Sequence, residues 1–203
     1  FVSISSLTIS LILSLSSLSI YRELIERNFL SHKMIFISIS ILLFVPSLSL
    51  SAMIFYLNFT LGFLLNNFLI VTLINSFFIT PIIFIFLINK FMENSKSEFR
   101  NSYLFNIHPF IRLIYIDMPK IRNELLLISS AVFILSLGDL TSVTIFNDSS
   151  FKTIPLYISQ LYSSYRYDDA FFILSIFIIF IIILMFIPLR YMFSNDKIKQ
   201  IKV

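Results

Sequence analysis

Long apolar stretches alternate with short charged segments along this chain. The stretch from Met34 to Asn89 runs for 56 residues without a charged side chain. A helix needs roughly 20 residues to cross about 30 Å of hydrocarbon, so this stretch is expected to cross a membrane twice. The apolar runs lack strict two-residue alternation, which favours helices over a transmembrane barrel. The pattern predicts an all-α membrane protein with five spans, at about 1–20, 34–56, 65–89, 124–146 and 170–190.

The basic residues separate cleanly between the gaps that this pattern leaves. Thirteen of the 15 lysines and arginines lie in three places: residues 21–33, residues 90–122 and the tail from Arg190. The alternate gaps, 57–64 and 147–169, hold none and two. Cytoplasmic loops carry the excess of basic residues, so the first set of gaps is predicted to be cytoplasmic. The N-terminal end then faces outward and the C-terminus faces the cytoplasm. Because topology explains the net charge of +4, no nucleic-acid role is predicted.

The composition excludes several classes of protein. At 58% hydrophobic and 13% charged residues, the chain is far from the roughly 25% charge of soluble domains. It has no cysteine, so it has no disulfide framework, and its two histidines, His32 and His108, lie in different segments and predict no metal site. No glycine-rich phosphate loop is present, so the chain is not expected to be an enzyme or to hydrolyse ATP itself. Because Phe1 already lies in an apolar stretch, we expect residues 1–203 to be one domain from a longer protein.

The segment 90–122 is more ordered in pattern than a simple tether. It holds six of the 15 basic residues, and residues 98–105 have a helical pattern. Asn106 suits the left-handed end of that helix, and Pro109 suits the first turn of a second one. The second helix is predicted to end at Asp117-Met118-Pro119, with His108 as a turn residue. We expect an apolar side on it, opposite Arg112, and exposed apolar side chains on a loop mark an interaction surface. That apolar side would consist of Phe110, Leu113, Ile114 and Ile116.

Residues 100–122, RNSYLFNIHPFIRLIYIDMPKIR, resemble the cytoplasmic coupling loop of binding-protein-dependent ABC importer permeases. In that family the loop has an acidic-Ala-Ala start, a central glycine and an (Ile/Leu)-x-x-Pro close, and it docks on a separate ATPase. Here Asn106 stands at the glycine position, Pro119 at the close, and residues 100–102 replace the acidic start. The resemblance implies ATPase-coupling roles for Tyr103, Leu104, Phe105, Asn106, Ile107, Pro109, Phe110, Arg112, Leu113 and Pro119.

Residues 128–170 are similar to the C-terminal half of thiamine importer permeases of the same family. The most similar pieces are SLGDL at 136–140, TIPLYISQ at 153–160 and SSYRYDDA at 163–170. The resemblance implies a type I importer permease in a bacterial inner membrane, carrying thiamine or its phosphates. It also implies four partners: an ABC ATPase dimer that binds ATP-Mg, a periplasmic substrate-binding protein, an N-terminal permease half or second copy, and membrane lipid. No cofactor is expected on this chain itself.

Two alternatives to a thiamine permease remain open from the sequence. Ferric iron or polyamine permeases share the same scaffold, so the cargo is open. A different class, a non-transport structural subunit of a membrane complex, fits the Phe- and Ile-rich spans equally well. The ordered segment 98–119 and the SLGD and TIPLY pieces favour a transporter, because a purely structural subunit does not need them.

Asp139 is the one ionisable side chain predicted deep within a span. A charge there costs roughly 2.5–3.5 kcal/mol on insertion scales, so it should face the bundle interior or a water-filled path. We expect the helix to be locally broken next to Gly138. One hypothesis places Ser136, Gly138 and Asp139 on a translocation path that favours a cation. The alternative is a carboxylate satisfied by neighbouring hydroxyl groups.

The outer segment 151–167 predicts an amphipathic helix. Thr153 is expected to cap it, with Pro155 in its first turn. Four tyrosines suit the aromatic belt at a membrane surface, which favours a helix lying on that surface. The alternative is an outer gate or a contact for the binding protein, formed by Thr153, Pro155, Tyr157, Tyr165 and Arg166.

Smaller features of the spans also lead to expectations. Pro46 and Pro81 lie inside predicted spans, and each is expected to kink its helix because proline lacks a backbone donor. The first span is rich in serine. These serines either line contacts between helices or are simply tolerated there.

Overall fold

The computed structural model describes the chain except for residues 27–30, 62–65, 94–104, 106, 147–151 and 202–203. The described residues fold into helices, which confirms the predicted all-α class. The elements are α1 Val2–Glu26, α2 Ser31–Ile41, η1 Leu42–Phe44, α3 Ser47–Leu61, α4 Asn67–Met92, α6 Pro109–Arg112, the π-helical turn η2 Leu113–Asp117, α7 Met118–Lys120, α8 Arg122–Leu137, α9 Thr141–Ile145, α10 Ile154–Ser163 and α11 Tyr167–Ile201.

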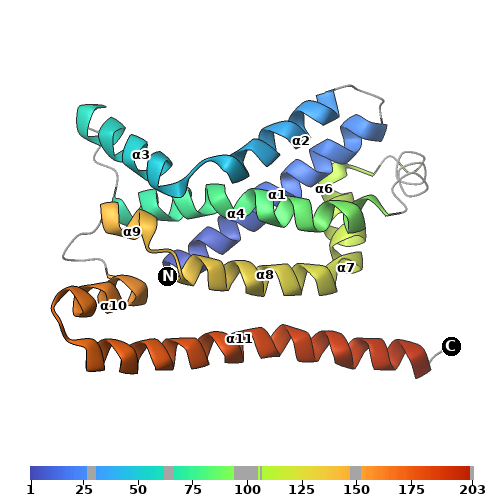
Figure 1. The fold of residues 1–203 in the computed structure, drawn as a ribbon. Helices are drawn as coiled ribbons and strands as arrows, with labels where there is room; N and C mark the ends of the chain where they lie inside the picture. The colour runs from blue at the N-terminus through green and yellow to red at the C-terminus, as the bar shows by residue number, and fades with distance from the viewer. Residues whose placement is uncertain (27–30, 62–65, 94–104, 106, 147–151, 202–203) are drawn as a thin grey trace.

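Four stretches within the described residues are long and apolar enough to cross a membrane, and the bent pair α2–α3 makes a possible fifth. They are Val2–Ile25, Asn67–Met92, Arg122–Ile145 and Tyr167–Arg190. Figure 1 shows the N-terminus, α9 and α10 at one end of the bundle, and α6, α7 and the C-terminus at the other. This arrangement agrees with the alternation predicted from the charged gaps. We call the end that carries α6 and α7 the basic end.

The second predicted span, 34–56, is not a straight helix but corresponds to the bent pair His32–Phe44 and Ser47–Leu61. Its two halves meet at an angle of 92°. Val45, the last residue before Pro46, is extended, with φ −77° and ψ 120°. The ring of a proline disfavours helical geometry in the residue before it, so the helix stops here instead of merely kinking. At Pro81 the expected kink does not interrupt the helix, because α4 continues through this residue.

Some of the serines of α1 line a contact between helices, as one of the two alternatives expects. Ser6, Ser10, Ser14, Leu18 and Arg22 recur every four residues, and all five are buried. Residues four apart share one face of a helix. Small side chains on that face let neighbouring helix backbones approach closely.

Hydrogen bonds fix the position of α1 against its two neighbours. The hydroxyl oxygens of Ser6 in α1 and Ser136 in α8 lie 2.8 Å apart. The Ser76 hydroxyl of α4 donates to the Ser6 carbonyl at 3.2 Å. Helices α1, α4 and α8 therefore form the core of the bundle, and α1 packs most extensively against α4.

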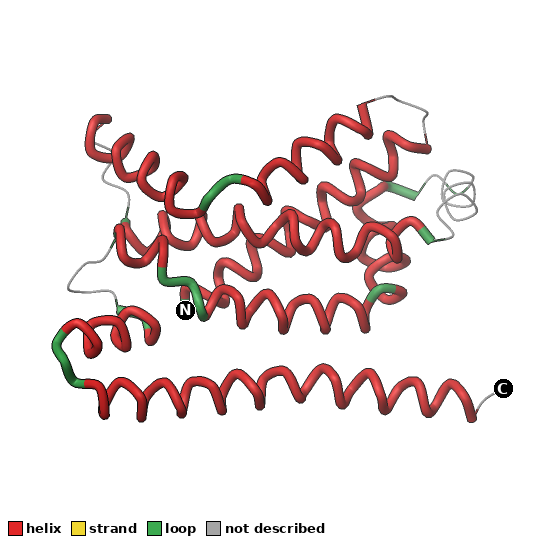
Figure 2. Tube along the Cα trace, in the orientation of Figure 1, coloured by secondary structure: helices red, strands yellow, loops and turns green. Residues whose placement is uncertain are grey.

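Helix α11 is far less buried than the other spans. It contacts α8 and α10 along one side. Figure 2 shows it as one long helix at the edge of the bundle. Most of its apolar side chains are exposed, which is expected of a helix that faces lipid or another protein.

Candidate functional site: the docking segment and the Asp139 cavities

Residues 109–120, which we call the docking segment, form one short helical run made of α6, η2 and α7. His108 precedes it, and its Nδ1 accepts a hydrogen bond from the Phe110 N–H at 3.3 Å. Pro109 lies in the first turn, where its missing N–H costs nothing, as predicted. The predicted end at Asp117-Met118-Pro119 is wrong: the run continues to Lys120.

The docking segment has two distinct faces. Leu113 and Asp117 are buried, and so is Ile121, which directly follows the segment at the same four-residue spacing. Leu113 and Ile121 belong to the core cluster of the bundle. The opposite face is apolar and open. It consists of Phe110, Ile111, Ile114 and Tyr115, which are 61%, 52%, 48% and 75% exposed.

Arg112 lies opposite the open apolar side, as predicted, and is 3% exposed. Leu113 was expected on the open apolar side, yet it lies in the core cluster with Leu18 and Phe91. The open side follows regular helical spacing through Phe110, Ile111, Ile114 and Tyr115, and Leu113 falls outside it. A π-helical turn begins at Leu113, whose carbonyl accepts a bond from the Met118 N–H.

An ion pair attaches the docking segment to α1. The guanidinium of Arg22 donates to both carboxylate oxygens of Asp117, with Nη1–Oδ1 at 2.7 Å and Nη2–Oδ2 at 2.9 Å. The two side chains are 1% and 4% exposed. The guanidinium carbon also lies 4.5 Å from the ring centroid of Phe91, which is within cation–π range. Three elements, α1, α4 and η2, therefore meet at one charged contact.

The sequence analysis missed this contact. One signal was available, because Arg22 continues the four-residue spacing of Ser6, Ser10 and Ser14 and so shares their buried face. No comparable signal selects Asp117 from the other charged residues of segment 90–122.

The remaining residues of the predicted coupling loop fall into two groups. Tyr103, Leu104 and Asn106 lie outside the described residues, as do all residues of the first predicted helix, 98–105, except Phe105. Phe105 and Pro119 are exposed, and Ile107 is half-buried.

Asp139 lies at a break between helices, as expected. Helix α8 ends at Leu137, and Gly138 follows at its C-terminus. The Asp139 carboxylate accepts hydrogen bonds from the Thr141 N–H at 3.1 Å and from the Thr141 hydroxyl at 2.7 Å. It also accepts one from the Ser142 hydroxyl. Asp139 forms no ion pair with any other described residue.

Two cavities of about 340 Å³ each flank this turn. Both are lined by Asn75, Ser136 and Asp139, which we call the polar wall. The first cavity reaches the N-terminus of α1 and the start of α10, and the second reaches Val45 and the start of α3. Neighbouring hydroxyl groups satisfy the Asp139 carboxylate, as the second hypothesis expects. The carboxylate also borders two cavities, which is compatible with the translocation path of the first hypothesis.

Asn75 is a member of the polar wall that the sequence analysis missed. Its side chain is 5% exposed. Its Oδ1 accepts a hydrogen bond from the Ser142 hydroxyl at 3.1 Å. Its Nδ2 has no hydrogen-bond partner among the described residues. The sequence does not indicate that this asparagine, one polar residue within an apolar span, lies beside a cavity.

The predicted outer helix is present as α10, and it starts where predicted. Thr153 precedes it and Pro155 lies in its first turn, but the Thr153 hydroxyl makes no capping hydrogen bond. Leu156, Ile158 and Leu161 are buried, whereas Tyr157 is exposed. Figure 1 shows α10 turned back beside the first turns of α11. Its predicted place at a membrane surface stays a prediction.

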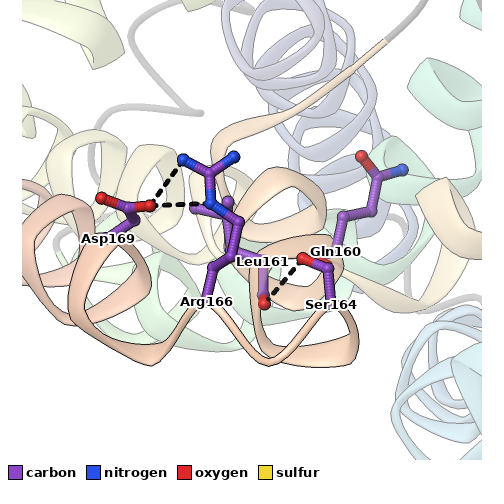
Figure 3. Close-up of polar contacts among 5 residues, drawn as sticks. All are labelled: Gln160, Leu161, Ser164, Arg166 and Asp169. Carbon is purple, nitrogen blue, oxygen red and sulfur yellow. Dashed lines mark hydrogen bonds and ion pairs between the residues drawn. The ribbon is translucent and has the colours of Figure 1, made fainter.

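The turn between α10 and α11 has the geometry of a helix C-terminus with a left-handed residue. Tyr165 has φ 60°, and the Arg166 N–H bonds to the Leu161 carbonyl at 3.0 Å. Figure 3 shows the Arg166 guanidinium directed at Asp169, with Nη2–Oδ2 at 2.6 Å. This ion pair is exposed, with 63% and 52% of the two side chains accessible.

No protein-family model matches the chain, and no curated protein matches it. The helices themselves decide the class. The chain is a multi-pass helical membrane protein.

Proposed function

We propose that this chain is the membrane-spanning permease subunit of an ATP-driven importer, coupled to a separate ATPase subunit. The observation that carries the proposal is the two-faced docking segment. One face is anchored in the bundle by Leu113, Asp117 and Ile121, and the other presents four exposed apolar side chains. A fixed element with an open apolar face at the end of a bundle suits a protein partner.

The location of the segment supports a partner in the cytoplasm. The segment lies at the basic end of the bundle, near the C-terminus of α4 and the start of α8. Thirteen of the 15 lysines and arginines belong to the gaps and tail of this side. Basic loops stay in the cytoplasm, where ATP and a soluble ATPase are found. The ATPase would bind and hydrolyse ATP-Mg, and its closure would move the docking segment.

The polar wall supports a transport path for a cation. Asp139 is half-buried, borders both cavities and has no ion-pair partner among the described residues. A carboxylate within a span favours a positive charge next to it, because few other groups there can balance its charge. We propose thiamine or its phosphates as cargo, following the resemblance of residues 136–140 and 153–160 to thiamine permeases. Ferric iron or a polyamine is the alternative cargo.

The remaining partners follow from the same proposal. A periplasmic binding protein would deliver cargo at the end that carries α9 and α10. The long exposed side of α11 suits lipid and a second permease half. The membrane would be the bacterial inner membrane.

Removal of two exposed rings from the docking segment tests the proposal. The variant is Phe110→Ala with Tyr115→Ala, two side chains that are 61% and 75% exposed. The probe is an ABC ATPase subunit from the same genome, co-expressed with the chain and purified through a tag on the chain. We expect at least a tenfold loss of bound ATPase, because aromatic anchors dominate the affinity of such contacts.

The matched control removes a ring from the opposite end of the bundle. Tyr165→Ala truncates a side chain that is 81% exposed, and it should leave the ATPase bound. Full binding by the Phe110/Tyr115 double variant would contradict the proposed docking face. Loss of binding in the control alone would contradict the proposed sidedness.

A further inference from the structure

Arg22 and Asp117, which are 1% and 4% exposed, form a buried ion pair between α1 and the docking segment, and the proposal above gives this pair no role of its own. We infer that their ion pair is the joint that ties the docking segment to α1 and passes its movement along α1 to the polar wall. The inference rests on the proposed function only for what moves the segment, namely an ATPase. The attachment itself is a property of this chain.

The geometry of the pair is that of a rigid attachment. The two terminal guanidinium nitrogens each donate to one carboxylate oxygen, Nη1 to Oδ1 at 2.7 Å and Nη2 to Oδ2 at 2.9 Å. A two-point contact of this kind fixes orientation as well as distance, because the guanidinium is planar. The ring of Phe91 lies against the guanidinium at 4.5 Å and restricts it from a third side.

The burial of the pair argues for a role in orientation rather than stability. Removing two charges from water is costly, so a buried ion pair is often no more stabilising than an apolar pair of similar size. Apolar neighbours such as Leu113 and Ile121 already attach the segment to the core. Their contacts are non-directional, so they permit sliding, whereas the ion pair fixes one arrangement.

Helix α1 leads from this joint to the cavities. Arg22 and Ser6 lie on the same buried face, 16 residues apart, which corresponds to about 24 Å of helix. At the far end, the hydroxyl oxygens of Ser6 and Ser136 are 2.8 Å apart. Ser136 belongs to the polar wall of both cavities. A continuous helix thus connects the docking segment with the place where cargo would pass.

A charge-free double variant tests the joint without any partner protein. In Arg22→Met with Asp117→Leu, both charges are removed together, which avoids leaving one of them buried alone. The measurement is hydrogen–deuterium exchange of the backbone amides of residues 110–121 in detergent micelles. We expect these amides to exchange at least tenfold faster, while the amides of α8 remain unchanged. The control is Arg166→Met with Asp169→Leu, the same change at an exposed pair, and it should leave residues 110–121 unaffected.

A second measurement distinguishes the transmission of movement along α1 from the simple attachment of the docking segment. Proteoliposomes would contain the chain, its ABC ATPase and a thiamine-binding protein, with labelled thiamine as cargo. We expect the double variant to hydrolyse ATP, because Phe110 and Tyr115 are intact, but to import at least tenfold less thiamine per ATP. A purely structural role would lower both quantities together and leave their ratio unchanged.

Each outcome has a defined meaning. Unchanged exchange of residues 110–121, or an unchanged ratio of uptake to hydrolysis, overturns the inference. Failure of the unmodified chain to bind the ATPase overturns the proposed function, and the exchange result then decides the joint alone. If the double variant does not fold, Arg22→Lys keeps the charge but loses the two-point geometry, and its exchange should rise in the same segment.

Discussion

The two ends of the molecule each hold an arginine–aspartate pair, and the pairs differ in nearly everything except chemistry. At the basic end, Arg22 and Asp117 come from elements 95 residues apart and are 1% and 4% exposed. At the other end, Arg166 and Asp169 are three residues apart and 63% and 52% exposed. The first pair joins separate parts of the fold. The second pair joins only two nearby residues at the start of α11.

The difference shows that burial and separation, not bond length, determine what an ion pair does. The exposed pair is as short as the buried one, at 2.6 Å against 2.7 Å. Water and salt screen the exposed charges, so their contact contributes little. Asp139 lies between these extremes, since it is half-buried and is held by hydroxyl and amide groups instead of a cation. The same substitution, aspartate to asparagine, therefore tests three environments.

The largest effect is expected for Asp117→Asn. It keeps the shape of the side chain but leaves the Arg22 guanidinium buried without an opposite charge. Breaking a buried pair from one side costs about 3–5 kcal/mol. The measurement is the free energy of unfolding in mixed micelles, from a titration with a denaturing detergent. A loss below about 1 kcal/mol would mean that the pair is not buried as described.

An intermediate effect is expected for Asp139→Asn. Its carbonyl still accepts a hydrogen bond, but the charge-assisted bonds from Thr141 and Ser142 weaken, so the free energy of unfolding should fall by about 1 kcal/mol. Uptake of a cationic cargo should fall at least tenfold, because the negative charge beside both cavities is gone. Unchanged uptake of labelled thiamine by this variant, in the same proteoliposomes, would remove Asp139 from the proposed path.

The smallest effect is expected for Asp169→Asn. Its partner Arg166 is exposed, so the change in the free energy of unfolding should stay below about 1 kcal/mol. Raising the salt concentration should shrink even this difference, whereas the effect of Asp117→Asn should persist. Equal losses for Asp169→Asn and Asp117→Asn would break the comparison between the two ends.

Much of the fold is predictable from the sequence, because membrane spans depend on local composition. The apolar runs predicted the spanning helices in α1, α4, α8 and α11 to within a few residues at most ends, although α11 extends further. The break at Gly138 and the helix start at Pro109 also follow from local backbone preferences. The bend at Pro46 was underestimated as a kink, since the pattern does not say whether neighbouring helices will hold a span straight.

The candidate site was only partly predictable. The docking segment was found by its pattern, and Arg112 was correctly placed opposite its open apolar side, but Leu113 was assigned to the open side and is buried. Apolar residues lie on both sides of this helical run, and the pattern does not say which of them the bundle covers. Asn75 could not be found, because an asparagine within an apolar run gives no sign of which neighbours it meets.

The sequence by itself determined that this is a helical protein of several membrane spans, because hydrocarbon demands long apolar helices whatever their neighbours are. It also determined which gaps carry the basic residues. Only the tertiary structure decided that Arg22 meets Asp117 and that Ser136, Asn75 and Asp139 share a wall between two cavities. Such contacts depend on how helices pack and rotate against one another. A pattern along one helix does not fix that rotation.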